Sequence, residues 1–432
     1  MSLRGAARAV FDAALRAADV NPLVRRALAD APLPDAARVR VVGAGKASGA
    51  MAAAAEQVLG DRIVDGLVVV KDGYRVETSR VRVMEAGHPV PDARGEAAAR
   101  EIHAIAESTD DVLLVLVSGG GSALTPAPAP PITLADKQAM TRLMLAAGAT
   151  INELNAVRKH CSLLKGGQLA RAAAPAAVRA LLLSDVIGDP LDVIASGPTA
   201  PDASTYADAL AILDRFDLRP RAPKSIVDRL ERGQRGEIPE TPKPDDPVFR
   251  HVTNTVIGNN RLVVDAAADE AVRLGYGPHV LTRSLEGEAR DVAARLVALA
   301  REIREGRGPV AAPACVIAAG ETTVTVRGRG RGGRCQEFVL AAALAMEGVD
   351  GLVALAAGTD GTDGPTDAAG GIVDGESARR ARALGQDPRA RLEDNDSNPL
   401  LAALGDLVVT GPTNTNLLDL YLLLIEPAST PP

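Results

Sequence analysis

The stretch Val112–Ala129, VLLVLVSGGGSALTPAPA, contains the sharpest change of chemistry in the chain. Its first part, Val112–Val117, is all Val and Leu, which is too short to span a membrane and typical of a strand buried on both faces. Glycines leave backbone N–H groups unshielded and serine hydroxyls add donors, so the loop that follows can close around an anion. We therefore expect substrate or phosphate binding by the five residues after the strand: Ser118, Gly119, Gly120, Gly121 and Ser122.

Composition limits the possible classes of protein. A chain of 432 residues is too long for one ordinary core and predicts two domains. A net charge of -7 argues against a general nucleic-acid binder, and aromatic residues, which stack on bases, are only 2% of the chain. Because Cys161, Cys315 and Cys335 lack CxxC spacing, neither a disulfide framework nor a zinc cluster is supported.

The start of the chain does not read as a secretory signal, and no charge-free apolar run reaches the length of a membrane span. We expect a cytoplasmic protein whose partners are small molecules, with no nucleic acid and no membrane among them.

A second glycine turn lies near the N-terminus. The short strand Arg38–Val42 leads into GAGKASG, residues 43–49, and then into an Ala-rich helix, an arrangement that presents helix N–H groups to a phosphate. The turn is not a P-loop, and its third glycine, Gly49, comes one position late for a dinucleotide fingerprint. Asp72, at the end of the next strand, could still bind a ribose, so a Rossmann oxidoreductase remains an alternative.

Strands and helices alternate through this half and predict a parallel sheet with βαβ crossovers. Ligands of such sheets bind at the carboxyl ends of the strands, where both glycine loops lie. The turn AGHPVPD, residues 86–92, offers His88 either as a base or as a structural hydrogen-bonding group. Asp92 is well placed to cap the helix that follows.

Charged residues follow the first glycine loops. On a helix, Asn155, Arg158 and Lys159 of NELNAVRKH fall within one turn, with Lys165 near the helix end. They form either an exposed basic face or an anion site beside the loop. In SDVIGDP, Asp185 and Asp189 could hold Mg²⁺ or cap a turn.

The second half repeats the α/β pattern after a segment rich in Pro and charge, residues 217–249, which is the best candidate for a linker. The segment RGRGRGGR, residues 327–334, is either an RNA-binding RGG element or, as we prefer in an acidic protein, a glycine-rich anion clamp with Arg334 as a phosphate ligand. The repeat GTDGTDGPTD, residues 358–367, lacks the oxygen pattern of an EF-hand and suits a turn that holds Mg²⁺–nucleotide or substrate hydroxyls.

Together these motifs resemble the glycerate 2-kinase family, in order and over nearly the whole chain, from about residue 7 to 425. The resemblance implies phosphorylation of D-glycerate at its 2-hydroxyl, with ATP and Mg²⁺, to give 2-phosphoglycerate. It also implies an α/β fold of two domains: an N-terminal Rossmann-like α/β/α sandwich, placed at 1–235, and a smaller C-terminal MOFRL-type α/β domain, placed at 236–432, with the active site in the cleft between them. The motifs that carry it are GAGKASG, AGHPVPD, SGGGSAL, NAVRKH, KGGQLA, LSDVIGDP, SGPT, GNN, GRGGRCQE, GTDGTDGPTDAAGG and GPTNTN.

By this resemblance the essential lysine and arginine of the family fall on Lys46 and Arg334, and Cys335 departs from the polar residue common at its position. Phosphoryl transfer depends mostly on positioning and on cations around the transferring group. The serine–glycine loop, with Arg158 or Lys159, would hold the glycerate carboxylate or the phosphates.

The remaining assignments are as follows. Asp185, Asp189 or Asp360 would carry Mg²⁺ or take the hydroxyl proton; we assign Asp189 to catalysis, and Asp185 with Asp189 to the metal. Substrate binding is assigned to residues 118–122 with Asn155, Arg158 and Lys159. An NAD(P)-dependent hydroxypyruvate reductase is the alternative function, and a homodimer is one expected assembly. Nucleotide binding is assigned to Gly43, Gly45, Lys165, Gly258, Asn259, Asn260, Glu321, Thr359, Asp360, Gly361, Thr413 and Asn416.

Overall fold

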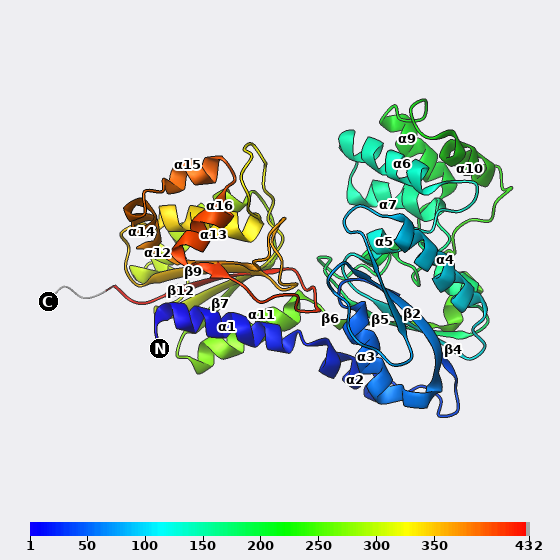
Figure 1. The fold of residues 1–432 in the computed structure, drawn as a ribbon, viewed down its shortest axis with the longest axis horizontal. Helices are drawn as coiled ribbons and strands as arrows, with labels where there is room; N and C mark the ends of the chain where they lie inside the picture. The colour runs from blue at the N-terminus through cyan, green and yellow to red at the C-terminus, as the bar shows by residue number, and fades with distance from the viewer. Residues whose placement is uncertain (429–432) are drawn as a thin grey trace. The chain divides into compact units, whose positions relative to one another are not determined.

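The computed structural model describes residues 1–428, and the chain divides into two compact units (Figure 1). The N-terminal unit comprises Val20–Ile257, and the C-terminal unit comprises Met1–Asp19 together with Gly258–Pro432. Each unit is an α/β structure built on its own six-stranded sheet, as the sequence predicts. Across the described residues, no helix combines the length and the apolar character needed to cross a membrane.

The sheet of the N-terminal unit has the order β3-β2-β1-β4-β5-β6. Neighbouring strands from β3 to β5 run parallel, which confirms the predicted βαβ pattern. Strand order reverses between β1 and β4, and this is the place where sheets of this kind bind ligands. The strands are β1 (Val39–Ala44), β2 (Ile63–Lys71), β3 (Arg82–Ala86), β4 (Val112–Val117), β5 (Ala177–Leu183) and β6 (Val252–Gly258).

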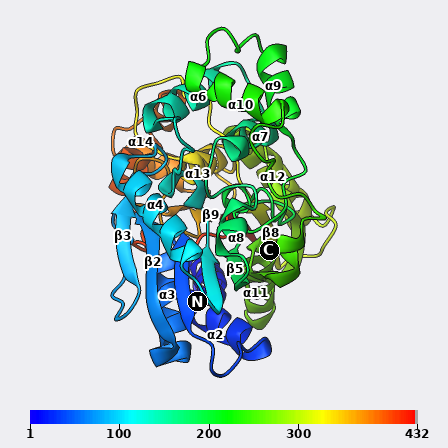
Figure 2. The same cartoon turned by 90° about the vertical axis from the view of Figure 1, so that its right-hand side faces the viewer.

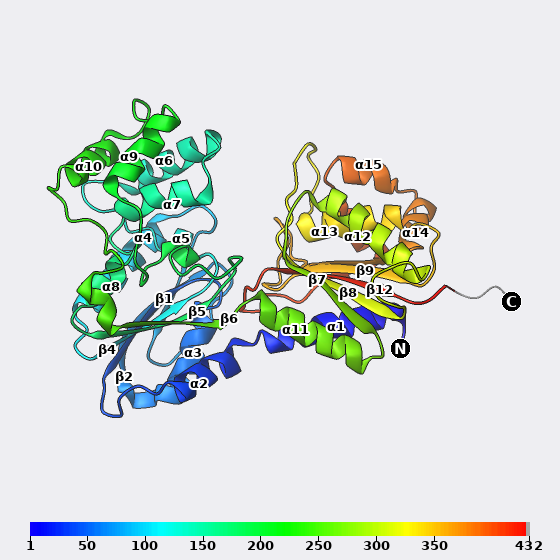
Figure 3. The ribbon, with the colours of Figure 1, turned by 180° about the vertical axis from the view of Figure 1, so that it is seen from behind.

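Helices cover both faces of this sheet. In Figure 3, α2 (Val20–Asp30) and α3 (Ser48–Leu59) lie on one face, and α4 (Ala93–Glu107) and α8 (Gln168–Ala173) lie on the other. The Asp92 carboxylate caps α4 by accepting the Gly95 N–H at 3.0 Å, as predicted. Every residue of β4 is buried, because its Val and Leu side chains pack against helices on both sides.

Four further helices form a separate layer of this unit, seen at the top of Figure 2: α6 (Leu134–Ala146), α7 (Ile151–His160), α9 (Tyr206–Arg215) and α10 (Lys224–Gln234). Their apolar faces share one core, which includes Met144, Val157, Tyr206 and Leu230. Residues 217–249 are therefore not a linker between domains, because α10 contributes to this core and Thr241 donates to the buried Asp202 carboxylate at 3.0 Å.

The sheet of the C-terminal unit is mixed, with the order β11-β10-β9-β12-β8-β7. Only β7 and β8 pair in parallel, while β12 runs antiparallel to both β8 and β9. The strands are β7 (Gly277–Leu285), β8 (Ala314–Gly320), β9 (Leu352–Gly358), β10 (Gly370–Asp374), β11 (Leu407–Val408) and β12 (Asp419–Ile425).

The helices of this unit also form two layers. Figure 3 shows α1 (Leu3–Ala17) and α11 (Asn260–Arg273) side by side on one face of the sheet. The helices on the other side are α12 (Ala289–Arg304), α13 (Arg334–Ala345), α14 (Ser377–Ala383), α15 (Pro388–Glu393) and α16 (Ser397–Leu404).

The boundary between the two units differs from the predicted division at 235/236. Strand β6 completes the first sheet, so the N-terminal unit extends to Ile257. Helix α1 belongs to the C-terminal unit because its buried face, which includes Val10 and Phe11, packs on α11, β9 and β12. The last strand, β12, stays within the C-terminal unit, between β8 and β9.

Candidate active site

Two glycine loops are interlaced at the carboxyl ends of the neighbouring strands β1 and β4. The Lys46 N–H donates to the Gly119 carbonyl at 3.0 Å, and the Ser118 N–H donates to the Ala44 carbonyl at 3.1 Å. The buried Ser118 hydroxyl accepts the Ala47 N–H at 2.9 Å. The loop after β1 and the loop after β4 therefore form one backbone structure, and Ser118 holds its two halves together.

Close packing in this structure explains two of its glycines. Gly45 has φ +140°, and a Cβ added there would lie 2.1 Å from Ser118 Oγ and 2.5 Å from its carbonyl oxygen. Gly120 has φ +89°, and a Cβ there would lie 3.1 Å from the ring of His88. The fold thus brings the AGHPVPD turn to the serine–glycine loop, and only glycine suits either backbone position.

The amides of Gly119 and Gly120 are not donors to any other group of residues 1–428. They follow a strand end and precede the short helix α5 (Gly121–Leu124). Unused N–H groups at this position are suited to donate to an anion, and anion binding by this loop stays a prediction.

Ser122 lies in a chain of buried and partly buried hydrogen bonds. Lys165 donates from Nζ to the Ser122 hydroxyl at 2.9 Å and to its carbonyl oxygen at 3.0 Å. The Ser122 hydroxyl also bonds to Ser196 Oγ at 2.9 Å, and Ser196 donates to Asn155 Oδ1 at 3.0 Å. Burial lowers the pKa of Lys165 well below its usual value, and repulsion from Lys137 and Arg158 adds to this. The predicted residues Asn155 and Lys165 are therefore brought to the loop, but as buried supports.

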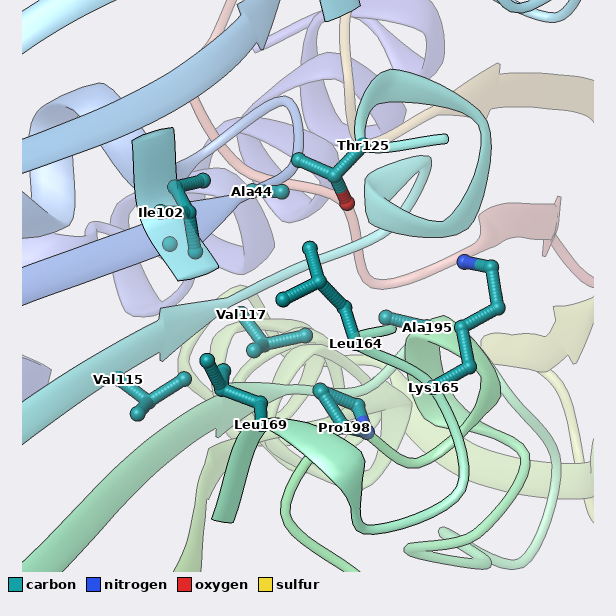
Figure 4. Close-up of a pocket in the computed structure, with 11 residues that line it drawn as sticks. Ala44, Ile102, Val115, Val117, Thr125, Leu164, Lys165, Leu169, Ala195 and Pro198 are labelled. Carbon is teal, nitrogen blue, oxygen red and sulfur yellow. The ribbon is translucent and has the colours of Figure 1, made fainter. Parts of the chain in front are cut away.

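An apolar cavity of about 30 Å³ lies beneath the two loops (Figure 4). The side chains of Val117, Leu164 and Leu169 face it, and Lys165 extends along one side. Its lining is mostly aliphatic, so the cavity forms part of the support for the loops.

Helix periodicity alone does not separate Arg158 from Lys159, but the structure does. Lys159 is buried and its Nζ lies 3.3 Å from Asp202 Oδ1 and 3.2 Å from Asp192 Oδ2. Arg158 has no carboxylate partner among residues 1–428, and burial lowers its pKa. Arg158 is therefore the cation that remains for an anionic ligand, whereas Lys159 stabilises the fold.

The acidic candidates of this unit have different surroundings. Asp185 and Asp189 are partly exposed in the loop after β5, and Asp189 has φ +54°. Asp72, the ribose ligand of the oxidoreductase alternative, instead accepts two hydrogen bonds from Arg94, at 2.7 and 2.9 Å. These bonds lower the pKa of Asp72 and tie its carboxylate to α4.

In the C-terminal unit, Arg334 is the first residue of α13. Its guanidinium donates to both oxygens of Asp419, the first residue of β12, with Nη2 to Oδ1 at 3.0 Å, and it also pairs with Glu321. Burial alone would lower the pKa of Arg334, but the charge and hydrogen bonds of Asp419 raise it. Arg334 is thus a permanently charged and oriented cation.

The adjoining glycine-rich segment does not form the expected anion clamp. The N–H groups of Arg327 and Gly328 donate to Asn395 Oδ1 at 2.8 and 3.0 Å. Those of Arg329 and Arg331 donate to the carboxylates of Asp394 and Asp396. These amides are therefore engaged with residues 394–396, and glycines are needed there because the two segments touch along their backbones.

A second correction concerns the start of α13. Its N-terminal N–H groups are capped by the buried Asp363 carboxylate, which accepts from Cys335 N at 3.2 Å and from Gln336 N at 2.8 Å. Burial and the nearby charge of Asp419 raise the pKa of Asp363 to about 6. The N-terminus of α13 is therefore already capped by a side chain of the protein, Asp363.

A cavity of about 600 Å³ opens beside Arg334. Its walls combine Arg334 and Glu321 with hydroxyls, glycine backbone and the apolar Val324. A space of this size can hold much of a nucleotide or a small acid. The other lining residues are Thr322, Thr323, Val326, Gly330, Gly332, Gly333, Glu337, Gly364, Pro365 and Asn395.

In this unit, hydrogen bonds also join the loop that follows β9 to the loop that precedes β12. The Thr359 hydroxyl donates to the Leu418 carbonyl at 2.7 Å, and Thr413 Oγ1 donates to the Thr359 carbonyl at 2.5 Å. A Cβ at Gly361 would lie 2.0 Å from the Gly411 carbonyl oxygen. Thr359 and Gly361 therefore shape the loop, and Asn259, assigned to the nucleotide with Gly258 and Asn260, caps α11.

Sequence reasoning missed Asp419 and Lys137. Asp419 opens an apolar strand, and its partner lies 85 positions away, so no local spacing reveals the pair. Lys137 lies on a helix with no nearby motif, and only its burial, at 5% exposure, distinguishes it. Over residues 1–428, no group of three or more His, Cys, Asp or Glu side chains is arranged to hold a metal ion.

Comparisons with known proteins define the class. Residues 6–231 match the family described as domain of unknown function DUF4147, and residues 314–419 match the MOFRL family. A D-glycerate 2-kinase of Thermotoga maritima is 44% identical over 90% of this chain and 91% of its own. A protein of Agrobacterium vitis, provisionally named as a hydroxypyruvate reductase, is 44% identical over 98% of this chain and 95% of its own.

A solved structure agrees with these matches. The crystal structure of a Thermotoga maritima glycerate kinase superposes with a TM-score of 0.89 and 41% identity, covering 98% of this chain and 99% of that one. The protein is thus a two-unit α/β chain that carries a DUF4147 domain followed by a MOFRL domain. It belongs to the glycerate 2-kinase family.

Proposed function

We propose that this protein is a phosphotransferase that uses ATP to phosphorylate D-glycerate at the 2-hydroxyl, giving 2-phosphoglycerate and ADP. The main support is that the 44% identity to the Thermotoga glycerate 2-kinase extends over 90% of the chain. The cytoplasmic location and the homodimer remain predictions.

In this proposal Lys46 and Arg334 both act on the transferring phosphoryl group. The 2-hydroxyl oxygen attacks the γ-phosphorus, the bond from that phosphorus to the β–γ bridging oxygen breaks, and ADP leaves. Fixed cations stabilise the negative charge on the phosphoryl oxygens as this happens. Asp189 takes the proton released by the hydroxyl group.

The acid is assigned to the N-terminal unit. The Gly119 and Gly120 amides and Arg158 are the groups for its carboxylate, with Ser122, Asn155, Lys159, Lys165, Ser118 and Gly121 supporting them. Gly43 and Gly45 keep their assignment to phosphate. In the C-terminal unit, the cavity beside Arg334 and Glu321 is assigned to the nucleotide, with the loops around Asp360 and Asn416 at its phosphates.

Magnesium is assigned to Asp185 and Asp189. Two partly exposed carboxylates in one loop suit Mg²⁺, which takes one or two protein carboxylates together with phosphate oxygens and water. When bound, the ion would neutralise charge on the phosphates.

The test is incubation with ATP, Mg²⁺ and D-glycerate, followed by ³¹P NMR identification of the phosphoglycerate isomer. We expect 2-phosphoglycerate from the wild type, loss of turnover in Lys46→Ala and Arg334→Ala with unchanged circular dichroism, and normal turnover in Lys224→Ala, an exposed lysine on α10. Near-normal phosphorylation by both site variants would rule out the assigned roles.

The reductase alternative is tested in parallel with hydroxypyruvate and NADH or NADPH. It is disfavoured because Asp72 is held by Arg94, away from the role of ribose ligand. Oxidation of the nicotinamide, without phosphoglycerate formation, would replace the kinase proposal.

A further inference from the structure

Lys137 on α6 is a buried cation without a partner in the part of the chain that the structure describes. The residue is 5% exposed, and its Nζ makes no hydrogen bond within the described residues. A buried ammonium group normally pairs with an anion, because leaving it unpaired in apolar surroundings is strongly unfavourable.

A second cation shares these surroundings. Lys137 and Arg158 line one cavity of about 10 Å³ between α6, α7 and α10, and Arg158 Nε is also buried without a hydrogen-bond partner in residues 1–428. The other walls are mainly apolar: Met140, Thr141, Met144, Leu154, Val157, Cys161 and Ile226.

The carboxylates of the surrounding helices are committed elsewhere. Asp136 accepts from Ser225 Oγ at 2.9 Å at the exposed start of α6, and Glu153 pairs with Arg215. Glu240 pairs with His160 at 3.1 Å, and Asp202 pairs with Lys159. Within residues 1–428, no protein anion is therefore placed to neutralise the two cations that face the cavity.

The cations also repel one another. Burial and the charge of Arg158 together lower the pKa of Lys137 to about 7, against a smaller opposing effect of Cys161. The charges of Lys137 and Arg158 also lower the pKa of Lys165. A negative charge in the cavity would relieve all three.

We infer that the cavity between Lys137 and Arg158 is a binding site for a small monovalent anion of halide size, such as chloride. A cavity of about 10 Å³ holds about one water-sized particle, which is too small for a carboxylic acid or a phosphate. Apolar walls with two cationic donors suit a large, weakly hydrated monatomic anion. The site supports α7, the helix that carries Asn155 and Arg158. Arg158 is shared with the proposed glycerate site, whereas Lys137 belongs to the halide site alone.

The test measures thermal unfolding of the full chain without substrates, at constant ionic strength, as sodium gluconate is replaced stepwise by chloride or bromide. A ligand that binds only the folded state raises Tm in a saturable manner. We expect this rise in the wild type and its loss in Lys137→Met, which should fold because methionine suits the apolar walls. Lys224→Met, which removes an exposed lysine paired with Asp228, should retain the rise.

A crystal grown or soaked in bromide should show one anomalous peak between Lys137 and Arg158. Equal halide effects on Tm in the wild type and Lys137→Met, or no halide effect in the wild type, would overturn the proposal. A Lys137-dependent rise caused by D-glycerate but not by chloride would overturn the halide assignment and make the cavity part of the substrate site. Because no turnover is measured, these results do not depend on the kinase activity.

Discussion

Arg334 and Asp419 form a bidentate ion pair that joins the start of α13 to the start of β12. Asp419 is buried at 2% exposure and also accepts a hydrogen bond from Tyr421 at 3.1 Å. Burial and the Tyr421 hydrogen bond hold the Asp419 carboxylate in place, and this carboxylate in turn sets the orientation of the Arg334 guanidinium. The orientation of the proposed catalytic arginine is set by a strand residue that itself need not touch a ligand.

Asp419→Asn should lower kcat by about 100-fold, because one misplaced group at a reacting phosphoryl is sufficient for such a loss. Steady-state kinetics with D-glycerate and ATP would measure it. The matched control is Glu321→Gln, which removes the exposed partner of Arg334 and should change kcat only a few-fold. Equal effects of the two substitutions would contradict a positioning role for Asp419.

Gly45→Ala should damage the interlaced loops. Its Cβ would lie 2.5 Å from the Ser118 carbonyl oxygen, which is backbone and cannot move aside, so we expect a loss of about 2–4 kcal/mol in the free energy of unfolding. Gly148→Ala is the control, since Gly148 also has a positive φ, +79°, but open space around it. It should lose only about 1 kcal/mol, from backbone strain. Urea unfolding measures both, and equal losses would be evidence against tight contact between the loops.

Lys159→Met and Arg158→Met should separate a structural cation from a binding one. Lys159→Met leaves Asp202 buried without its ion-pair partner and should lower the free energy of unfolding by about 3 kcal/mol. Arg158→Met removes a cation without a carboxylate partner in residues 1–428, so stability should change by less than about 1 kcal/mol while KM for D-glycerate rises. The reverse pattern in denaturant titrations and kinetics would assign the roles the other way.

The sequence predicts the elements of this fold better than their partners. Val112–Val117 is bounded correctly because an apolar run followed by glycines has few other solutions. The same local reasoning places Arg158 and Lys159 on one turn of a helix. It cannot say which of the two pairs with Asp202, because Asp202 lies in a loop 43 positions from Lys159. The glycine-rich segment differs from the prediction for a similar reason, since residues 394–396 accept the hydrogen bonds of its amides.

Domain boundaries have the same limitation. A change of composition at residues 217–249 looks like a linker, yet α10 buries Ile226 and Leu230 in the helical layer. The crossing of α1 to the C-terminal unit has no sequence signal, because an amphipathic helix does not specify which sheet it covers.

The raised pKa of Asp363 predicts a dependence of stability on pH. Its pKa is about 6 in the folded protein and 3.8 ordinarily, so the folded state holds the proton more tightly. The resulting stabilisation is fully present below about pH 3.8 and is lost as the pH rises through about 6. Asp363→Asn removes this titration. The free energy of unfolding of the wild type minus that of the variant should therefore be larger at low pH than at neutral pH. One pH unit below the folded pKa, the increase should already be about 1 kcal/mol. Urea titrations at several pH values measure this difference, and every other carboxylate titrates in both proteins. A difference that stays flat or falls as the pH is lowered would show that Asp363 is not held with a raised pKa at the start of α13.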